Sequence, residues 1–210
     1  VPKQLISEGI QDIIAGPTYG FGLSNTGKIY SWGYTRVSDS IDMKDIPAEL
    51  TDGSVDIAFL AAGSDHAVAI DTEDNFYFWG NTRLRQDQYE SNSELNMALR
   101  RGDLEIKQLE AGNQFSIILD TAGNVYLWGN PSGNELDCRD KERIEEGEDK
   151  EPRQYQGNIE KVAVTDHSYI ALLKDGTVAY TGYEKDNALN TNLPVELTDG
   201  SVRVVDIAST

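Results

Sequence analysis

Apolar and polar residues alternate in four short segments of the chain, and this pattern predicts four β-strands. Each segment has two bulky apolar residues separated by one small or aliphatic residue, as a half-buried strand does. A turn position follows, and then a run of aromatic and β-branched residues that favours a second strand. We expect the apolar pairs to be buried, together with the tryptophan of each second strand. These residues are Phe21 and Leu23, Val68 and Ile70, Ile117 and Leu119, Ile170 and Leu172, with Trp32, Trp79 and Trp128.

The turn between the two strands uses the same position in every segment. Gly27, Gly123 and Gly176 occupy it in three segments, and Asp74 occupies it in the other. Glycine adopts positive φ without steric cost, and Asp is among the few other residues that tolerate it. The sequence therefore predicts a hairpin turn with positive φ at all four positions. We also expect the glycine that follows each Trp to turn the backbone or allow a close approach.

The four segments are copies of one repeated unit. A leading position lies 17 residues before a glycine in each copy: Gly16 before Gly33, Gly63 before Gly80, Gly112 before Gly129 and Thr165 before Gly182. A further apolar run precedes each copy and predicts a third strand, and residues 193–202 match residues 46–55. We expect one segment over residues 1–210, with units near 2–45, 46–102, 103–151, 152–192 and a partial unit 193–210. Short antiparallel strands at this period are typical of a β-propeller.

The repeat resembles that of the regulator of chromosome condensation family. Its motif reads Ala-Gly-x-x-His-x-x-Ala-Ile/Leu-x-x-x-Gly-x-Val-Tyr-x-Trp-Gly and covers nearly the whole chain, and residues 129–136 resemble the segment that follows the motif in the family. The resemblance implies an all-β, seven-bladed propeller. His66 alone occupies the family's His position, and the fourth unit has Thr165 and Thr181 in place of Gly and Trp. Four units and part of a fifth do not close such a ring, so we expect part of a longer propeller, with completion by another subunit as the alternative.

Charge narrows the classes of partner. The chain has 36 acidic residues against 18 Lys and Arg, a formal net charge of −18. Such a field repels phosphate backbones and anionic membrane surfaces, so we expect neither nucleic acid nor membrane as a partner. The one cysteine, Cys138, cannot form an internal disulfide or a thiolate zinc site. We expect a cytoplasmic or virion-associated protein rather than a disulfide-stabilised secreted one.

The sequence contains no recognisable catalytic motif, and we expect no enzyme, no cofactor and no metal site. His66 and His167 lie at adjacent repeat positions and are more plausible as locally bonded turn residues than as catalytic bases. Residues 71–75 alternate oxygen-bearing side chains as a calcium loop does. They lack its Gly and its distant bidentate Glu, so we do not expect calcium there.

Two long connections carry the candidate binding residues. Residues 82–102, which include a predicted short helix after Ser91, and residues 136–151 both follow a Trp-Gly strand, so we expect them on one face of the propeller. A self-packed or merely solvated surface loop is the alternative for each. The candidate partner-binding residues combine apolar anchors with surrounding arginines. They are Arg83, Arg85, Tyr89, Leu95, Met97, Leu99, Arg100 and Arg101.

The sequence favours an interaction platform, built as a structural or adaptor subunit of a larger protein assembly such as a phage particle. Its partners would be other proteins, most simply neighbouring subunits. The family resemblance also implies an alternative, a regulator that exchanges guanine nucleotide on a small GTPase. A fold supports many functions, so the resemblance alone does not decide between the two.

Overall fold

The computed structural model describes residues 1–81, 102, 104–113, 115–129, 157–165, 168–182 and 193–208. The chain forms two compact units, Val1–Asp87 and Gln88–Thr210, and each contains two sheets of three strands. The expectation of one segment over 1–210 with the unit boundaries given above stays a prediction. The two units are described in turn.

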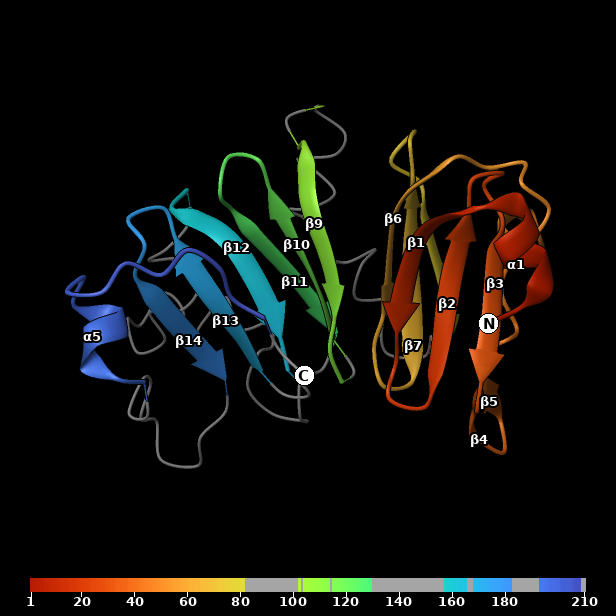
Figure 1. Cartoon of the computed structure of the whole chain (residues 1–210), viewed down its shortest axis with the longest axis horizontal. Helices are drawn as coiled ribbons and strands as arrows, with labels where there is room; N and C mark the ends of the chain where they lie inside the picture. The colour runs from red at the N-terminus through yellow and green to blue at the C-terminus, as the bar shows by residue number, and fades with distance from the viewer. Residues whose placement is uncertain are drawn as a thin grey trace, which may run out of the picture. The chain divides into compact units, whose positions relative to one another are not determined.

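The first unit begins with a short helix and then builds two antiparallel sheets with the strand orders β1-β2-β3 and β6-β7-β8 (Figure 1). A two-stranded hairpin, β4-β5, lies between them in the sequence. The elements are α1 Lys3–Glu8, β1 Ile10–Ala15, β2 Tyr19–Ser24, β3 Ile29–Gly33, β4 Arg36–Ser38, β5 Ile41–Asp42, the 3-10 helix η1 Ala48–Leu50, β6 Ile57–Ala62, β7 His66–Asp71 and β8 Phe76–Gly80.

The second unit repeats the same sheet twice, with the orders β9-β10-β11 and β12-β13-β14. Its elements are β9 Ile106–Ala111, β10 Phe115–Asp120, β11 Val125–Gly129, β12 Ile159–Val164, β13 Ser168–Leu173, β14 Val178–Gly182 and the helix α5 Val195–Thr198. The longest helix in the described ranges is α1, at six residues, and none there is long and apolar enough to cross a membrane. The prediction of an all-β fold with four antiparallel units is confirmed.

The four hairpin turns have the predicted backbone. Gly27, Gly123 and Gly176 have φ of 78°, 96° and 88°, and Asp74 has φ of 62°. Asp74 is the one residue other than glycine with positive φ among those described. One chain position therefore demands left-handed backbone in every repeat, and the sequence meets this demand with Gly or Asp.

A β-bulge recurs at one position in each first strand, which the sequence did not lead us to expect. The register of the first strand against the middle strand shifts just after the same residue type each time. The four residues are Ile10, Ile57, Ile106 and Ile159, each six positions before the leading position of its repeat. A bulge adds local twist to a strand pair, so all four sheets gain this twist at the same point.

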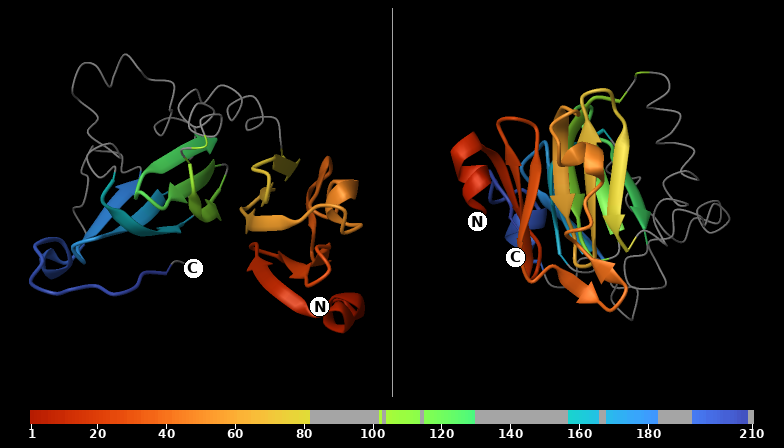
Figure 2. Two further views of the ribbon diagram at one scale, coloured as in Figure 1. Left: turned by 90° about the horizontal axis from the view of Figure 1, so that it is seen from above. Right: turned by 90° about the vertical axis from the view of Figure 1, so that its right-hand side faces the viewer.

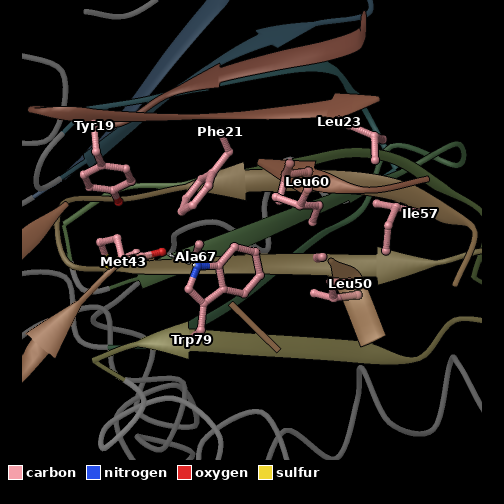
Figure 3. Packing of buried hydrophobic residues seen from close by; sticks show 11 residues of the cluster. Tyr19, Phe21, Leu23, Met43, Leu50, Ile57, Leu60, Ala67 and Trp79 are labelled. Carbon is pink, nitrogen blue, oxygen red and sulfur yellow. Dashed lines mark hydrogen bonds between the residues drawn. The ribbon is translucent and has the colours of Figure 1, made fainter. Parts of the chain in front are cut away.

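The middle strands are buried on both faces, and the prediction of half-buried strands was wrong. Every residue of β2, β7 and β10 is buried. One face of a middle strand packs on the neighbouring repeat: Phe21 and Leu23 of β2 share a core cluster with Ala67 and Ala69 of β7 (Figure 3). The small residue between the bulky pair faces the opposite way, so alternation here separates large from small side chains rather than buried from exposed ones.

The same arrangement holds in the second unit. Ile117 and Leu119 of β10 share a cluster with Ala171 and Leu173 of β13. The bulky pair of one repeat thus packs against the alternate positions of the next repeat. Consecutive sheets stack through this contact, as blades of a propeller do.

Two residues expected in the core are only half-buried. Trp32 lies over Gly20, on the face of the first sheet where Leu5 of α1 and Trp32 both approach Gly22. Figure 2 shows α1 beside this sheet. Ile170 is on the face of β13 opposite the core cluster. In contrast, Trp79 is 3% exposed because the first repeat covers it. The side chain of Trp128 lies outside the described residues.

Candidate protein-interaction site

The chain leaves the first two sheets through the same backbone geometry. Gly33 and Gly80 end the third strands with φ of 88° and 83°. The next residue then donates its backbone N–H to a carbonyl before the middle strand, from Tyr34 to Thr18 at 2.8 Å and from Asn81 to Asp65 at 2.7 Å. A Cβ on either glycine would lie within 2.7 Å of that carbonyl oxygen. The connections after residues 33 and 80 therefore start at the same end of their sheets.

The connection after Gly33 is the β4-β5 hairpin, and its base is anchored in the core of the first unit. Met43 is fully buried, and its backbone N–H donates to the Thr35 carbonyl at 2.8 Å. The Met43 carbonyl accepts a hydrogen bond from the Trp79 indole at 3.1 Å. Lys44 lies 3.0 Å from Asp42, and its hydrogen bond, with that of Thr35, lowers the pKa of the Asp42 carboxyl to about 2. The base of the hairpin is therefore held by both repeats.

The rest of the hairpin presents side chains to solvent. Tyr34 is 68% exposed and Val37 is 40% exposed. The Arg36 side chain is largely exposed, and its nearest carboxylate, that of Asp39, is 3.9 Å away. Figure 1 shows β4 and β5 beyond the end of β3, opposite its turn with β2. Tyr and Arg are residue types that often dominate the binding energy of protein interfaces. Both are exposed on this anchored hairpin, beside Val37.

This hairpin was missed from the sequence, although a signal for it was present. Arg36-Val37-Ser38 and Ile41 flank the turn residues Asp39 and Ser40, a short strand-turn-strand pattern. It occupies the repeat position of residues 82–102 and 136–151. Those two connections, with the predicted short helix and all eight candidate residues from Arg83 to Arg101, lie outside the described residues, apart from Gly102, and stay predictions.

The acidic hairpin turns are used for local hydrogen bonding. The Asp71 carboxylate accepts bonds from the backbone N–H groups of Glu73 and Asn75, from the Asn75 side chain and from the Tyr77 hydroxyl, at 2.8–3.0 Å. Asp120 in the third repeat accepts the corresponding bonds from the backbone and side chain of Asn124 and from the Tyr126 hydroxyl. These donors occupy the oxygens that a calcium ion would need. Within the described part of the chain, no cluster of three His, Cys, Asp or Glu could hold a metal ion.

His66 is a buried residue at the start of β7. Its side chain is 1% exposed, and its Nδ1 lies 3.6 Å from the Asp65 carboxylate. The Asp65 side chain in turn accepts a hydrogen bond from Asn81 at 2.8 Å. The ring of His66 is thus buried beside the Asp65 carboxylate, and its interpretation as a locally bonded turn residue stays a prediction. His167 lies outside the described residues.

Glu110 on β9 is a charged residue at a position that is otherwise apolar. Its counterparts are Ile14, Ala61 and Ala163 in the other three repeats. Burial raises the pKa of the Glu110 carboxyl, and the charge of Lys161 offsets this only in part. The ionised form therefore destabilises the fold at neutral pH, and protonation relieves the destabilisation as the pH falls through the raised pKa.

We predict that Glu110→Gln raises the thermal unfolding midpoint at pH 7, because the amide removes a partly desolvated charge. The gain should shrink as the pH is lowered towards 4, where the wild-type carboxyl is itself neutral. Unfolding scans at several pH values measure this difference. A constant or inverted difference for Glu110→Gln would contradict the account.

The chain was compared with protein-family models, with curated proteins and with solved structures. The sequence matches no protein-family model, and no curated protein matches it. Among solved structures, human WBSCR16 superposes with a TM-score of 0.58 at 17% identity, over 96% of this chain and 56% of that one. Prp20p from Saccharomyces cerevisiae, studied for its binding to Gsp1p and histones, gives 0.51 at 19% identity, over 90% and 49%. The ectodomain of the Physcomitrella patens receptor kinase CR4 gives 0.52 at 16% identity, over 82% and 41%.

These neighbours establish the architecture. WBSCR16 and Prp20p are propellers of the regulator of chromosome condensation type, and this chain spans about half of their length. The antiparallel three-stranded sheets, the repeated turns and the packing of one repeat on the next within each unit agree with that architecture. The fold of this chain is therefore a β-propeller of the regulator of chromosome condensation type.

Proposed function

We propose that this chain is a non-enzymatic β-propeller platform that binds other proteins through the connections following the Trp-Gly strands. The observation that carries the proposal is the β4-β5 hairpin. Its base is fixed by Met43 and Trp79, and it exposes Tyr34 and Val37 to solvent. An apolar surface held on a rigid base loses little conformational entropy when it is covered, so it favours binding.

The connections at 82–102 and 136–151 would extend this surface, since they follow the same repeat position. The acidic charge favours basic or neutral partner surfaces and disfavours nucleic acid. The likeness to Prp20p supports a protein partner in general terms. A structural or adaptor subunit of a larger assembly is the role that we favour.

A photo-crosslinking experiment tests the proposal in the cells from which the chain comes. A photoreactive phenylalanine at position 34 should form protein adducts, whereas one at position 73, in the turn at the other end of the second sheet, should not. Tyr34→Ser with Val37→Ser should reduce co-purification of the same proteins at least tenfold while the unfolding midpoint is kept. Adducts at position 73 alone, or unchanged co-purification by the double variant, would refute binding through the connections that follow the Trp-Gly strands. Labelled duplex DNA should not bind the chain at physiological salt.

A nucleotide-exchange factor is the second candidate, because Prp20p binds the protein Gsp1p according to its structural study. Such a factor accelerates release of nucleotide from a bound GTPase. A fluorescent-nucleotide release assay on the GTPases of the source cell separates the two functions. We expect no acceleration by this chain. A rate that rises with its concentration would replace the platform with the exchange factor.

A further inference from the structure

The helix α1 is held on the first sheet by two of its side chains. Leu5 is fully buried, and a Cβ at Gly22 would overlap its side chain, so the glycine leaves the hollow that Leu5 fills. The Glu8 carboxylate accepts hydrogen bonds from side chains of the β2-β3 hairpin. The donors are Thr26 Oγ1 at 2.6 Å, Lys28 Nζ at 3.0 Å and Tyr30 Oη at 2.9 Å. Leu5 and Glu8 are three residues apart, a spacing that places both on one face of the helix.

The other repeats show what is unusual in the contact of Glu8. Tyr77 and Tyr126 occupy the repeat position of Tyr30. Their hydroxyls donate to Asp71 and Asp120, which are carboxylates of the same hairpin as the tyrosine. In the fourth repeat the two positions carry Leu173 and Ala179, so that repeat lacks the tyrosine and the carboxylate together.

The first repeat keeps the tyrosine but has Ser24 in place of the aspartate and Lys28 in place of the asparagine that follows it. Its hairpin, residues 19–33, contains no Asp or Glu. The donors of Thr26, Lys28 and Tyr30, which we call the carboxylate cradle, are therefore directed at an acceptor that must come from outside the hairpin. Hydrogen bonds from Thr26 and Lys28 lower the pKa of the Glu8 carboxyl to about 2, so the cradle favours an ionised carboxylate.

The helix that supplies this carboxylate is held weakly. It has six residues, and Leu5 is the one that is buried. Pro2 gives no side-chain cap, and the first turn has no acidic residue and the last turn no basic one to favour the helix dipole. A segment with so few buried contacts opens at a lower free energy than the sheet beneath it. Opening of α1 exposes the carboxylate cradle and the hollow at Gly22 together.

We propose that the carboxylate cradle and the hollow at Gly22 form a peptide-binding site, which α1 closes as an autoinhibitory strap. The ligand is a helical turn of a partner protein with a leucine and, three residues later, a glutamate. Lys28 and the two hydroxyls complement the charge of the glutamate, and Gly22 leaves room for the leucine. Figure 1 shows α1 beside β3 and the β4-β5 hairpin beyond the far end of that strand. The site is therefore independent of the proposed function and takes a different partner.

A synthetic peptide with the sequence of residues 2–10, blocked at both ends, is the probe for this site. We expect saturable shifts of the backbone amide signals of Gly22 and Thr26 when the peptide is added to the Leu5→Ser, Glu8→Gln double variant. This variant, the undocked chain, retains the site but has lost both side chains by which α1 closes it. The unaltered chain should bind the peptide at least tenfold more weakly. Absence of saturable binding to the undocked chain would overturn the proposal.

Ile6→Ser is the matched control for the undocked chain. Ile6 lies on the same helix but is 61% exposed, so its substitution should leave the site closed. The Ile6→Ser chain should bind the peptide as weakly as the unaltered chain does. Binding as strong as that of the undocked chain would show that α1 does not close the site through Leu5 and Glu8.

The carboxylate requirement is tested by a second peptide with glutamine in place of its glutamate. It should bind the undocked chain at least tenfold more weakly than the first peptide. Adding Lys28→Met to the undocked chain should remove most of this difference, because the charged donor of the carboxylate cradle is then lost. Equal binding of the two peptides by the undocked chain would refute the carboxylate site.

Hydrogen exchange of the unaltered chain tests the strap without any substitution. The N–H of Ile6 donates to the Pro2 carbonyl and that of Gly9 to the Ile6 carbonyl. These two amides should exchange at least tenfold faster than those of β2, and a saturating amount of the first peptide should speed them further. Exchange of α1 and β2 at one rate, or no effect of the peptide on α1, would contradict an opening strap.

Discussion

Trp79→Ala should lower the free energy of unfolding by about 3–5 kcal/mol, as large-to-small changes at buried aromatic positions do. Trp79 lies between two repeats: its ring meets Phe21 edge-on at 5.2 Å, and its indole N–H donates to the Met43 carbonyl (Figure 3). The substitution therefore leaves a cavity and removes the partner of a buried carbonyl. Chemical denaturation of the purified chain measures the loss.

Trp32→Ala is the matched control, because Trp32 has the same repeat position but is half-buried. It should cost about 1–2 kcal/mol, in line with its smaller buried area. Equal losses for the two variants would contradict the packing described here. An unchanged midpoint for Trp79→Ala would show that the contact between the first two repeats is not part of the core.

Gly80→Ala should destabilise the chain by about 2–4 kcal/mol, from left-handed backbone strain and from steric overlap. Gly80 has φ of 83°, and a Cβ there would lie 2.5 Å from the Asp65 carbonyl oxygen and 2.7 Å from the Met43 sulfur. The overlap falls where the third strand ends and the connection begins. The variant should therefore also disturb the base of the β4-β5 hairpin.

Gly200→Ala separates the two causes. Gly200 has φ of 79°, and the nearest atom to a Cβ is a methyl carbon at 3.7 Å. Only the backbone strain applies there, and the cost should be about 1–2 kcal/mol. If both glycine variants lose the same free energy of unfolding in parallel denaturation curves, steric overlap with the Asp65 carbonyl does not contribute to the cost of Gly80→Ala.

The turns and strands could be predicted because they depend on local chemistry. Positive φ restricts the turn position to Gly or Asp, and this restriction is visible in each repeat separately. The repeat then allows one interpretation to be checked four times. For the same reason, the strands expected at the apolar pairs and at the aromatic runs that follow the turns are present in the structure.

Burial on both faces could not be predicted from one strand, because it depends on what packs against the sheet. Glycines alternate with Phe21 in β2, and alanines alternate with Ile70 in β7. Small residues at these positions are compatible with close packing of another sheet as well as with exposure to solvent. Trp32 and Ile170 depart from the pattern because, within its own unit, each lies on the sheet face that does not pack against the other sheet. The bulge follows an isoleucine in all four first strands, but isoleucine is equally common in regular strands and so does not predict a bulge. The β4-β5 hairpin has only a weak signature, the short strand-turn-strand pattern of residues 36–41.

The central claim, that this propeller binds proteins by the face on which its Trp-Gly strands end, is tested most directly by hydrogen exchange. The crosslinked partner, once purified, would be added to the chain and amide protection compared with the free chain. We predict slower exchange at residues 34–42 and within 82–102, and none at the turns 25–28 and 72–75. Those turns lie at the opposite end of the same strands. Protection confined to the turns would contradict the account.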